Sequence, residues 1–221
     1  MSLPKKIPEF AKRYLQDNVI TSLRPSQIKA IDAGLFQGNS LLVCTPTASG
    51  KTLVGELALL KALNDYEHPI TVYVVPLRAL AAEKYASFSK KFLKHRVTLT
   101  SGDMDSDDPY LADYDIIITT SEKLDSLLRH RAEWVSRIRC VVVDEIHLLN
   151  DASRGPTLEV LITMLRRVCS PLQLIGLSAT IGNAAELAAW LDAKLIEDSW
   201  RPIPLKEGVY VQGTIHFDTI R

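Results

Sequence analysis

Short runs of apolar residues alternate along this chain with longer stretches in which apolar positions recur every three or four residues. The short runs predict strands that are buried on both faces. The longer stretches predict amphipathic helices, as the spacing of Leu53, Leu57, Leu60 and Leu63 illustrates. The expected strands are residues 41–44, 71–75, 97–100, 115–119, 140–143 and 172–177, and the expected helices are residues 53–64, 79–93, 123–129, 157–168 and 184–191.

This alternation of strand and helix predicts an α/β fold with a mostly parallel β-sheet and helices on both faces. Helices of this length between strands imply parallel pairing through right-handed crossovers. Ligands of such sheets gather at the carboxyl ends of the strands. We expect a lead segment at residues 1–20, one domain at residues 21–205, and a β-hairpin within residues 209–217, around Gln212 and Gly213.

Composition and charge narrow the functional classes. The 26 basic and 26 acidic side chains give a net charge of zero, whereas a domain that held nucleic acid by broad electrostatics would be basic. The three cysteines lie in apolar segments without metal-ligand spacing, so we expect free buried thiols. Neither a signal peptide nor an apolar run near membrane-spanning length is present, so we expect a cytoplasmic protein that does not bind membranes.

The segment from Thr45 to Thr52 predicts a phosphate-binding loop between a strand and a helix. We expect Lys51 to reach the outer phosphates of ATP and the Thr52 hydroxyl to bind Mg²⁺. Thr45 stands where such loops normally carry glycine, and an ordinary turn with a solvated lysine is the alternative. The residues expected to surround the nucleotide here are Thr47, Ala48, Ser49, Gly50, Lys51 and Thr52.

A second motif, Asp144-Glu145-Ile146-His147, follows the apolar run at residues 140–143. Acidic side chains at the end of a buried strand are costly unless they have a role. We expect Asp144 to hold Mg²⁺ and Glu145 to polarise the water that attacks the γ-phosphate, so that both join Lys51 as catalytic candidates. A strand-end turn with two exposed acids is the alternative.

With these motifs, the chain resembles the first motor domain of a superfamily-two helicase, which is a RecA-like P-loop NTPase domain. The resemblance covers roughly residues 20–205 and rests on several motifs in order. It implies that Gln27 hydrogen-bonds to adenine through both ends of its amide and that Arg24 lies near the nucleotide. It implies strand contacts from Pro76, Arg78, Gly102, Asp103, Thr119, Thr120, Ser121 and Arg154, and coupling of the two sites through His147, Ser178 and Thr180.

Several of these residues also have a structural interpretation. Arg78 is equally suited to be a solvated arginine in the first turn of a helix, and Arg24 to pair with a carboxylate. Ser121 suits the N-cap of a helix that carries Lys123 on an exposed face. A histidine such as His147 is often satisfied by neighbouring backbone groups.

Finer features indicate a branch of the superfamily. The sequences Asp-Glu-Ile-His, Arg-Gly-Pro-Thr from Arg154 and Trp-Arg-Pro-Ile-Pro-Leu from Trp200 are similar to the archaeal Hjm-type DNA repair helicases and their eukaryotic relatives. The branch implies ATP and Mg²⁺ as cofactors, single-stranded DNA rather than RNA as partner, 3′-to-5′ travel and, in an archaeal cell, association with the nucleoid. An RNA helicase of the same branch is the alternative.

After Leu205 the sequence contains no second array of strands and helices. The resemblance implies a second RecA-like domain whose arginine completes the ATP site, so we expect residues 206–221 to begin a linker or that domain in a longer protein. An arginine supplied across such an interface contributes roughly 10³ to 10⁵ in rate. We expect ATP binding, slow hydrolysis and no unwinding by this chain. The alternatives are a nucleotide-binding module without turnover and a small-molecule kinase.

Overall fold

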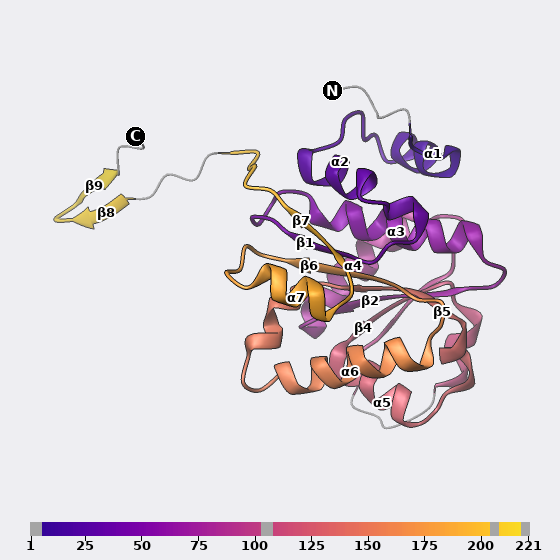
Figure 1. Cartoon of the computed structure of the whole chain (residues 1–221). Coiled ribbons are helices and arrows are strands. Elements are labelled where there is room, and N and C mark those ends of the chain that lie inside the picture. The colour runs from indigo at the N-terminus through magenta and orange to yellow at the C-terminus, as the bar shows by residue number, and fades with distance from the viewer. Residues whose placement is uncertain (1–5, 103–107, 204–207, 218–221) are drawn as a thin grey trace.

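The computed structural model describes residues 6–102, 108–203 and 208–217 (Figure 1). Its centre is a seven-stranded sheet with the order β3-β4-β2-β5-β6-β1-β7, in which every neighbouring pair is parallel. The expected parallel α/β sheet is therefore confirmed. The strands are β1 (Leu41–Cys44), β2 (Ile70–Val75), β3 (Val97–Thr100), β4 (Ile116–Thr120), β5 (Ile138–Val143), β6 (Gln173–Ser178) and β7 (Lys194–Glu197).

Helices cover both faces of the sheet, as the sequence predicts (Figure 1). One face carries α1 (Glu9–Asp17), α2 (Pro25–Asp32), α3 (Lys51–Asp65) and α4 (Arg78–Lys91). The other face carries α5 (Ser121–Arg129), α6 (Gly155–Val168) and α7 (Ala184–Trp190). Short 3₁₀ turns are η1 (Leu35–Gln37), η2 (Pro109–Asp113), η3 (Glu133–Arg137) and η4 (Ile146–Asn150).

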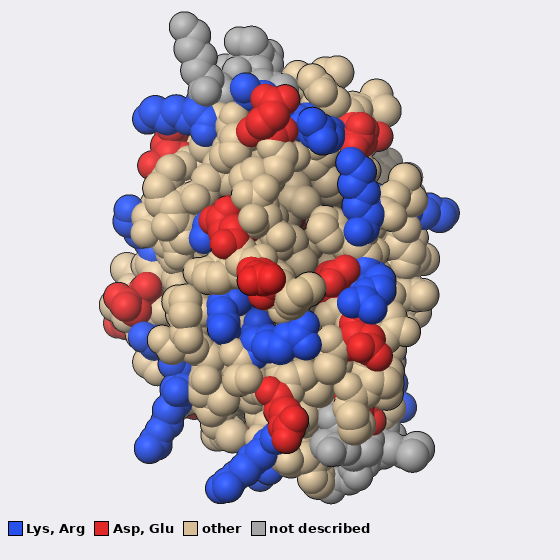
Figure 2. Space-filling view, turned by 90° about the vertical axis from the view of Figure 1, so that its right-hand side faces the viewer, with Lys and Arg blue, Asp and Glu red and all other residues tan. Residues whose placement is uncertain are grey.

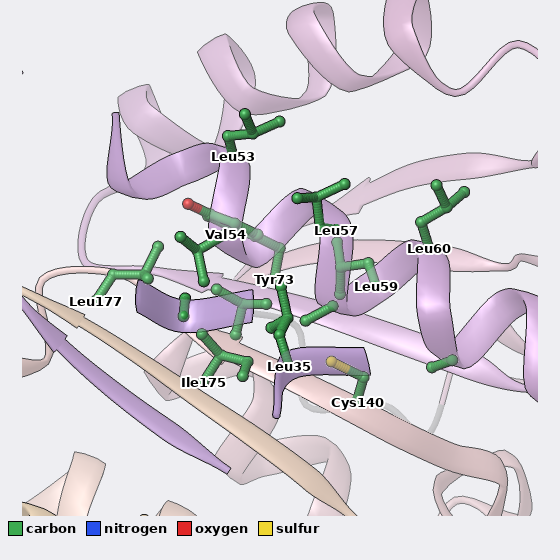
Figure 3. Packing of buried hydrophobic residues seen from close by; sticks show 14 of the residues in the cluster. Leu35, Leu53, Val54, Leu57, Leu59, Leu60, Tyr73, Cys140, Ile175 and Leu177 are labelled. Carbon is green, nitrogen blue, oxygen red and sulfur yellow. The ribbon is translucent and has the colours of Figure 1, made fainter. Parts of the chain in front are cut away.

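Helix α3 is the centre of the first apolar layer. Its residues 53–62 are all buried, because the sheet lies on one side and α1 and α2 lie on the other. A helix in this position needs mostly apolar residues, and the buried charges of α3 are paired: Glu56 with Lys91, and Lys61 with Asp65. In Figure 3, Leu53 and Leu57 of α3 lie in the same cluster as Tyr73, Ile175 and Leu177 of the sheet. The helix that follows the phosphate-loop motif is therefore firmly fixed.

Of two elements near the C-terminal end of the chain, one was predicted from the sequence and the other was not. The strand β7 was not predicted, since Lys194 and Glu197 make it polar and only Ile196 is buried. The hairpin was predicted and is confirmed: β8 (Gly208–Val211) and β9 (Thr214–Phe217) pair antiparallel. Its turn residues Gln212 and Gly213 have φ of 46° and 86°, as a tight hairpin turn requires.

The surface carries both signs of charge. Figure 2 shows basic and acidic side chains interspersed over one face, in keeping with the net charge of zero. None of the helices in the described ranges combines the length and apolar character needed to cross a membrane.

Candidate functional site

The parallel sheet brings the sequence motifs to one edge. The order β4-β2-β5-β6-β1 places the residues that follow each of these strands side by side. Two hydrogen bonds join neighbouring motifs: the amide of Thr45 donates to Ser178 O at 3.2 Å, and the amide of Asp144 donates to Val74 O at 2.8 Å. The phosphate-loop motif and the acidic motif therefore lie at the same end of the fold.

The loop between β1 and α3 has the backbone of an anion-binding turn. Ala48 and Gly50 have φ of 64° and 89°, and the amides of Thr47, Ala48 and Gly50 make no hydrogen bond to another described residue. A Cβ atom added at Gly50 would lie 2.7 Å from Gln27 Nε2, so only glycine fits there. Free amides in this conformation, at the N-terminus of α3, suit a phosphate group.

Thr45, the departure from the usual loop pattern, is accommodated inside the turn. Its hydroxyl lies 2.7 Å from the Ser49 hydroxyl, and both residues are buried. Ser49 also donates its amide to Pro46 O at 3.2 Å. The hydrogen bond between the Thr45 and Ser49 hydroxyls stabilises the loop where it leaves β1.

Lys51 is half-buried and hydrogen-bonded to the loop, which disfavours the alternative of a merely solvated lysine. Its ammonium donates to Thr45 O at 2.8 Å and to Pro46 O at 3.4 Å. Burial lowers the pKa of Lys51, and the charges of Glu145 and Asp144 oppose that shift. The ammonium is thus held inside the loop, beside both acids.

Both oxygens of the Asp144 carboxylate have partners. Its Oδ2 accepts a hydrogen bond from the Tyr73 hydroxyl at 2.8 Å and lies 3.4 Å from Lys84 Nζ. Its Oδ1 accepts from the amide of Glu145 at 3.1 Å. The alternative of a turn with two exposed acids is therefore wrong for Asp144, whose side chain is 14% exposed.

The predicted Mg²⁺ ligands fit the ion. The Thr52 hydroxyl and Asp144 Oδ2 converge on one cation, because Lys84 Nζ lies 3.0 Å from the first and 3.4 Å from the second. Among the described residues, no three His, Cys, Asp or Glu side chains gather as a metal cage would require. Mg²⁺ in nucleotide sites needs only one or two protein oxygens, since phosphate oxygens and water complete its shell.

Glu145 has an unusual backbone at the point where β5 ends. Its φ of 52° is rare for a residue other than glycine. Its Oε2 lies 3.4 Å from His147 Nδ1, and that nitrogen has no hydrogen-bond partner among the described residues. The alternative of a histidine satisfied by backbone groups is therefore not observed. The imidazole of His147 instead lies beside Glu145, the candidate general base.

Gln27 lies against the phosphate loop, and both ends of its amide are hydrogen-bonded. Its Nε2 donates to Gly50 O at 2.9 Å, and its Oε1 accepts from the Arg24 amide at 2.8 Å, which caps the N-terminus of α2. The residue is 4% exposed and lines a hollow beside the loop, so its contact with adenine stays a prediction. Gln27 fixes the loop to α2 in this structure.

Arg24 pairs with the loop rather than with a carboxylate. Its Nη1 donates to Ala48 O at 2.5 Å, and its guanidinium lies 5.4 Å from the centre of the Trp200 ring. Both side chains line a hollow of about 690 Å³ that also reaches Thr52. This volume is within the usual range for a small-molecule site.

Four of the predicted strand-contacting residues lie near the acidic motif or at the surface. Arg154 Nη1 donates to Pro76 O at 3.4 Å, so both stand at the end of β2 beside Asp144. Arg78 is exposed as the first residue of α4. Gly102 is exposed after β3, whereas Asp103 lies outside the described residues.

The other predicted strand contacts are buried. Thr119, Thr120 and Ser121 are at most 6% exposed. The N-cap of α5 is Thr120, whose hydroxyl accepts from the Lys123 amide at 3.4 Å, so the alternative that gave this position to Ser121 is wrong. Lys123 is itself buried and pairs with Asp108 at 2.9 Å, not exposed as that alternative required.

The predicted coupling residues occupy different environments. Ser178 is fully buried at the end of β6, where its carbonyl holds the phosphate loop. Thr180 is exposed two residues later. The two lie between the loop after β1 and the acidic motif after β5, because β6 separates these strands.

Sequence reasoning missed two members of the site, Tyr73 and Lys84. Both contact Asp144, and Lys84 Nζ also lies 5.2 Å from the centre of the Tyr73 ring. Each belongs to a segment that was predicted as an ordinary strand or helix. The sequence signal is Tyr73 itself, the one aromatic residue of the mostly apolar strand β2.

Comparison with known proteins identifies the family. The profile of DEAD/DEAH box helicases matches residues 24–187. This chain belongs to the DEAD/DEAH box helicase family. The predicted resemblance to superfamily-two helicases is confirmed.

The curated relatives agree with the Hjm-type branch, and a solved helicase structure shares the fold. ATP-dependent DNA helicase Hel308 of Pyrobaculum calidifontis is 51% identical over 203 residues, and that of Methanocaldococcus jannaschii is 50% identical over 210 residues. Each match covers 92% of this helicase chain but only 28% and 17% of the relatives' lengths. A crystal structure of the DUF1998 helicase MrfA bound to DNA and AMPPNP has a TM-score of 0.73 and 26% identity, over 90% of this chain and 30% of that one.

Proposed function

We propose that this chain is the ATP-binding motor half of an ATP-dependent DNA helicase that acts in repair or recombination. One observation carries the proposal: the Thr52 hydroxyl and the Asp144 carboxylate converge beside the loop that holds Lys51. This is the arrangement that Mg-ATP needs. The relatives named as Hel308 DNA helicases, about half identical to this chain, support the choice of DNA.

The chain's own residues have distinct parts in the proposed reaction. The loop amides and Lys51 bind the phosphates, and Arg24 with Trp200 lines the hollow for the rest of the nucleotide. Thr52 and Asp144 would hold Mg²⁺, and the bound ion would neutralise charge on the phosphates. Glu145 accepts the proton of the attacking water, and His147, whose Nδ1 lies 3.4 Å from Glu145 Oε2, couples this site to the strand site.

Single-stranded DNA is proposed to lie across the ends of β2, β4 and β3, next to the nucleotide. Arg78 and Gly102 are exposed there, and Arg154 stands between the ends of β2 and β5. Contacts of this kind hold phosphates without reading sequence. We further propose 3′-to-5′ travel, driven when ATP closes residues 21–205 on a second RecA-like domain of the longer protein, to which residues 206–221 lead.

Binding of a fluorescent ATP analogue tests the nucleotide site. We expect saturable binding in Mg²⁺ and at least a tenfold loss of affinity in Lys51→Met, a change of about 1.4 kcal/mol or more. The control is Lys90→Met, which removes an exposed lysine of α4. Equal affinity of Lys51→Met and the unsubstituted chain would contradict the proposed site. Competition between single-stranded DNA and RNA in the same buffer separates the proposed substrate from its alternative.

A further inference from the structure

Lys84 sits where a surface lysine would not be expected. It belongs to α4, whose Tyr85 and Lys90 are exposed, yet its own side chain is only 18% exposed. Lysine normally keeps its ammonium in water while its stem lies along the protein. Here the ammonium points into the candidate ATP site.

Inside the site, Lys84 contacts both oxygens expected to hold the metal. Its Nζ donates to Thr52 Oγ1 at 3.0 Å and lies 3.4 Å from Asp144 Oδ2. The face of the Tyr73 ring, 5.2 Å away at its centre, supplies a further favourable contact for a cation. These three contacts come from α3, the end of β5 and β2, so the ammonium ties together three separate elements.

Mg²⁺ and the Lys84 ammonium cannot both bind the oxygens of Thr52 and Asp144. Mg²⁺ binds oxygen at about 2.0–2.1 Å and needs the lone pairs that face Lys84. Two cations that shared the same two oxygens would repel each other strongly in a partly buried site. A metal that takes both Thr52 and Asp144 must therefore displace Lys84.

We propose that Lys84 is a resident counter-cation that holds Thr52 and Asp144 together without nucleotide and competes with Mg²⁺ for them. This inference rests on the proposed function, because it requires that Mg-ATP binds here. Lys84 is then a positioning residue that sets how strongly Mg²⁺ promotes nucleotide binding. Loss of its charge should make the metal-bound nucleotide bind more tightly.

The test is the dissociation constant of a fluorescent ATP analogue, measured in saturating Mg²⁺ and again in EDTA. Lys84→Met keeps the aliphatic stem and removes the charge. We expect its dissociation constant in Mg²⁺ to fall about fivefold or more, the usual lower range of coupling between sites. In EDTA the constant should stay equal or rise, since no metal competes there.

Matched variants separate this effect from general damage. Lys90→Met, which removes an exposed lysine of the same helix, should match the unsubstituted chain in both buffers. Lys84→Arg keeps the charge and should restore the weaker binding in Mg²⁺. If Lys84→Met does not fold, Lys84→Gln takes its place under the same criteria.

The outcomes distinguish the two proposals. If the unsubstituted chain does not bind the analogue in Mg²⁺, the proposed function fails. If it binds and Lys84→Met binds equally or more weakly in Mg²⁺, the competition fails, and Lys84 is a structural or phosphate-binding residue instead. Tighter binding by Lys84→Met in Mg²⁺ alone, reversed by Lys84→Arg, supports the competition.

Discussion

The hydroxyl of Tyr73 donates a 2.8 Å hydrogen bond to Asp144 Oδ2 across the neighbouring strands β2 and β5. Tyr73 is fully buried, and burial, followed by the charge of Asp144, raises its pKa. The phenol therefore remains a donor at neutral pH and fixes the orientation of the carboxylate. A buried residue of the core thus controls a candidate metal ligand.

Replacing Tyr73 with Phe removes this hydrogen bond and leaves Asp144 with fewer partners. A hydrogen bond to a charged group contributes about 1.5–3 kcal/mol, so we expect a loss of that size in the free energy of unfolding. Urea denaturation measures it. Tyr85→Phe, at an exposed position of α4, should change the same free energy by less than about 0.5 kcal/mol. A change equally small in Tyr73→Phe would show that the hydrogen bond does not hold Asp144.

Gly155 allows α6 to approach the 3₁₀ turn η4, which follows Glu145. A Cβ atom at this position would lie 2.2 Å from Leu149 O, a backbone atom that cannot move alone. We expect Gly155→Ala to lower the free energy of unfolding by about 3 kcal/mol, at the upper end of the usual cost of overpacking. Gly182→Ala is the control, because a Cβ there meets nothing within 4 Å. Equal urea midpoints for the two variants would exclude the close approach.

The ion pair between Lys29 and Asp198 predicts a pH-dependent contribution to stability. Lys29 Nζ lies 2.8 Å from Asp198 Oδ2 and ties α2 to the end of β7. The hydrogen bond from Lys29 is the main cause that lowers the pKa of Asp198 below its ordinary 3.8. Because the folded-state pKa is the lower one, the stabilisation is complete above pH 3.8 and is lost as the pH falls through the folded-state pKa.

Asp198→Asn should therefore destabilise the chain at pH 7 and have no effect in strong acid. We expect a loss of at most about 1 kcal/mol at pH 7, since Lys29 is largely exposed. Thermal melts at pH 7 and at successively lower pH measure the difference between variant and parent. A difference that persists unchanged at the lowest pH would rule out the ionised pair as its cause.

Salt should weaken single-strand binding only gradually. The net charge is zero and basic and acidic side chains are mixed, so few phosphate contacts are available (Figure 2). Each neutralised phosphate adds about −0.7 to the log–log slope of affinity against salt for single strands. We expect a slope shallower than about −5 in a fluorescence anisotropy titration. A steeper slope would show that more basic side chains contact the phosphates than we expect.

The core of the fold was predictable because its strands are buried on both faces. Such strands are continuous apolar runs, and Cys140 to Val143 is an example that needs no tertiary information. The edge strand β7 was not predictable in this way, since Lys194 and Glu197 point to solvent. Its pairing with β1 depends on the sheet that it joins.

The candidate site was predictable where the chemistry lies in consecutive residues. The loop that ends in Lys51 and the acidic motif at Asp144 are of that kind. Lys84 and Tyr73 were missed because only the packing of α4 and β2 brings them to Asp144. The contact of Gln27 with the loop was hidden for the same reason, since the fold places the Gly50 carbonyl against its amide.

The central claim, that this chain drives a DNA motor with ATP, is tested most directly in the full-length protein that contains it. The measurement is steady-state ATP turnover with and without single-stranded DNA, for the parent and for Glu145→Gln. We predict strong stimulation by DNA in the parent, and in the variant a loss of turnover of at least about 100-fold, within the range expected for a general base. ATP binding by the variant should stay close to that of the parent. Turnover that DNA does not stimulate, or near-normal turnover in Glu145→Gln, would contradict the account.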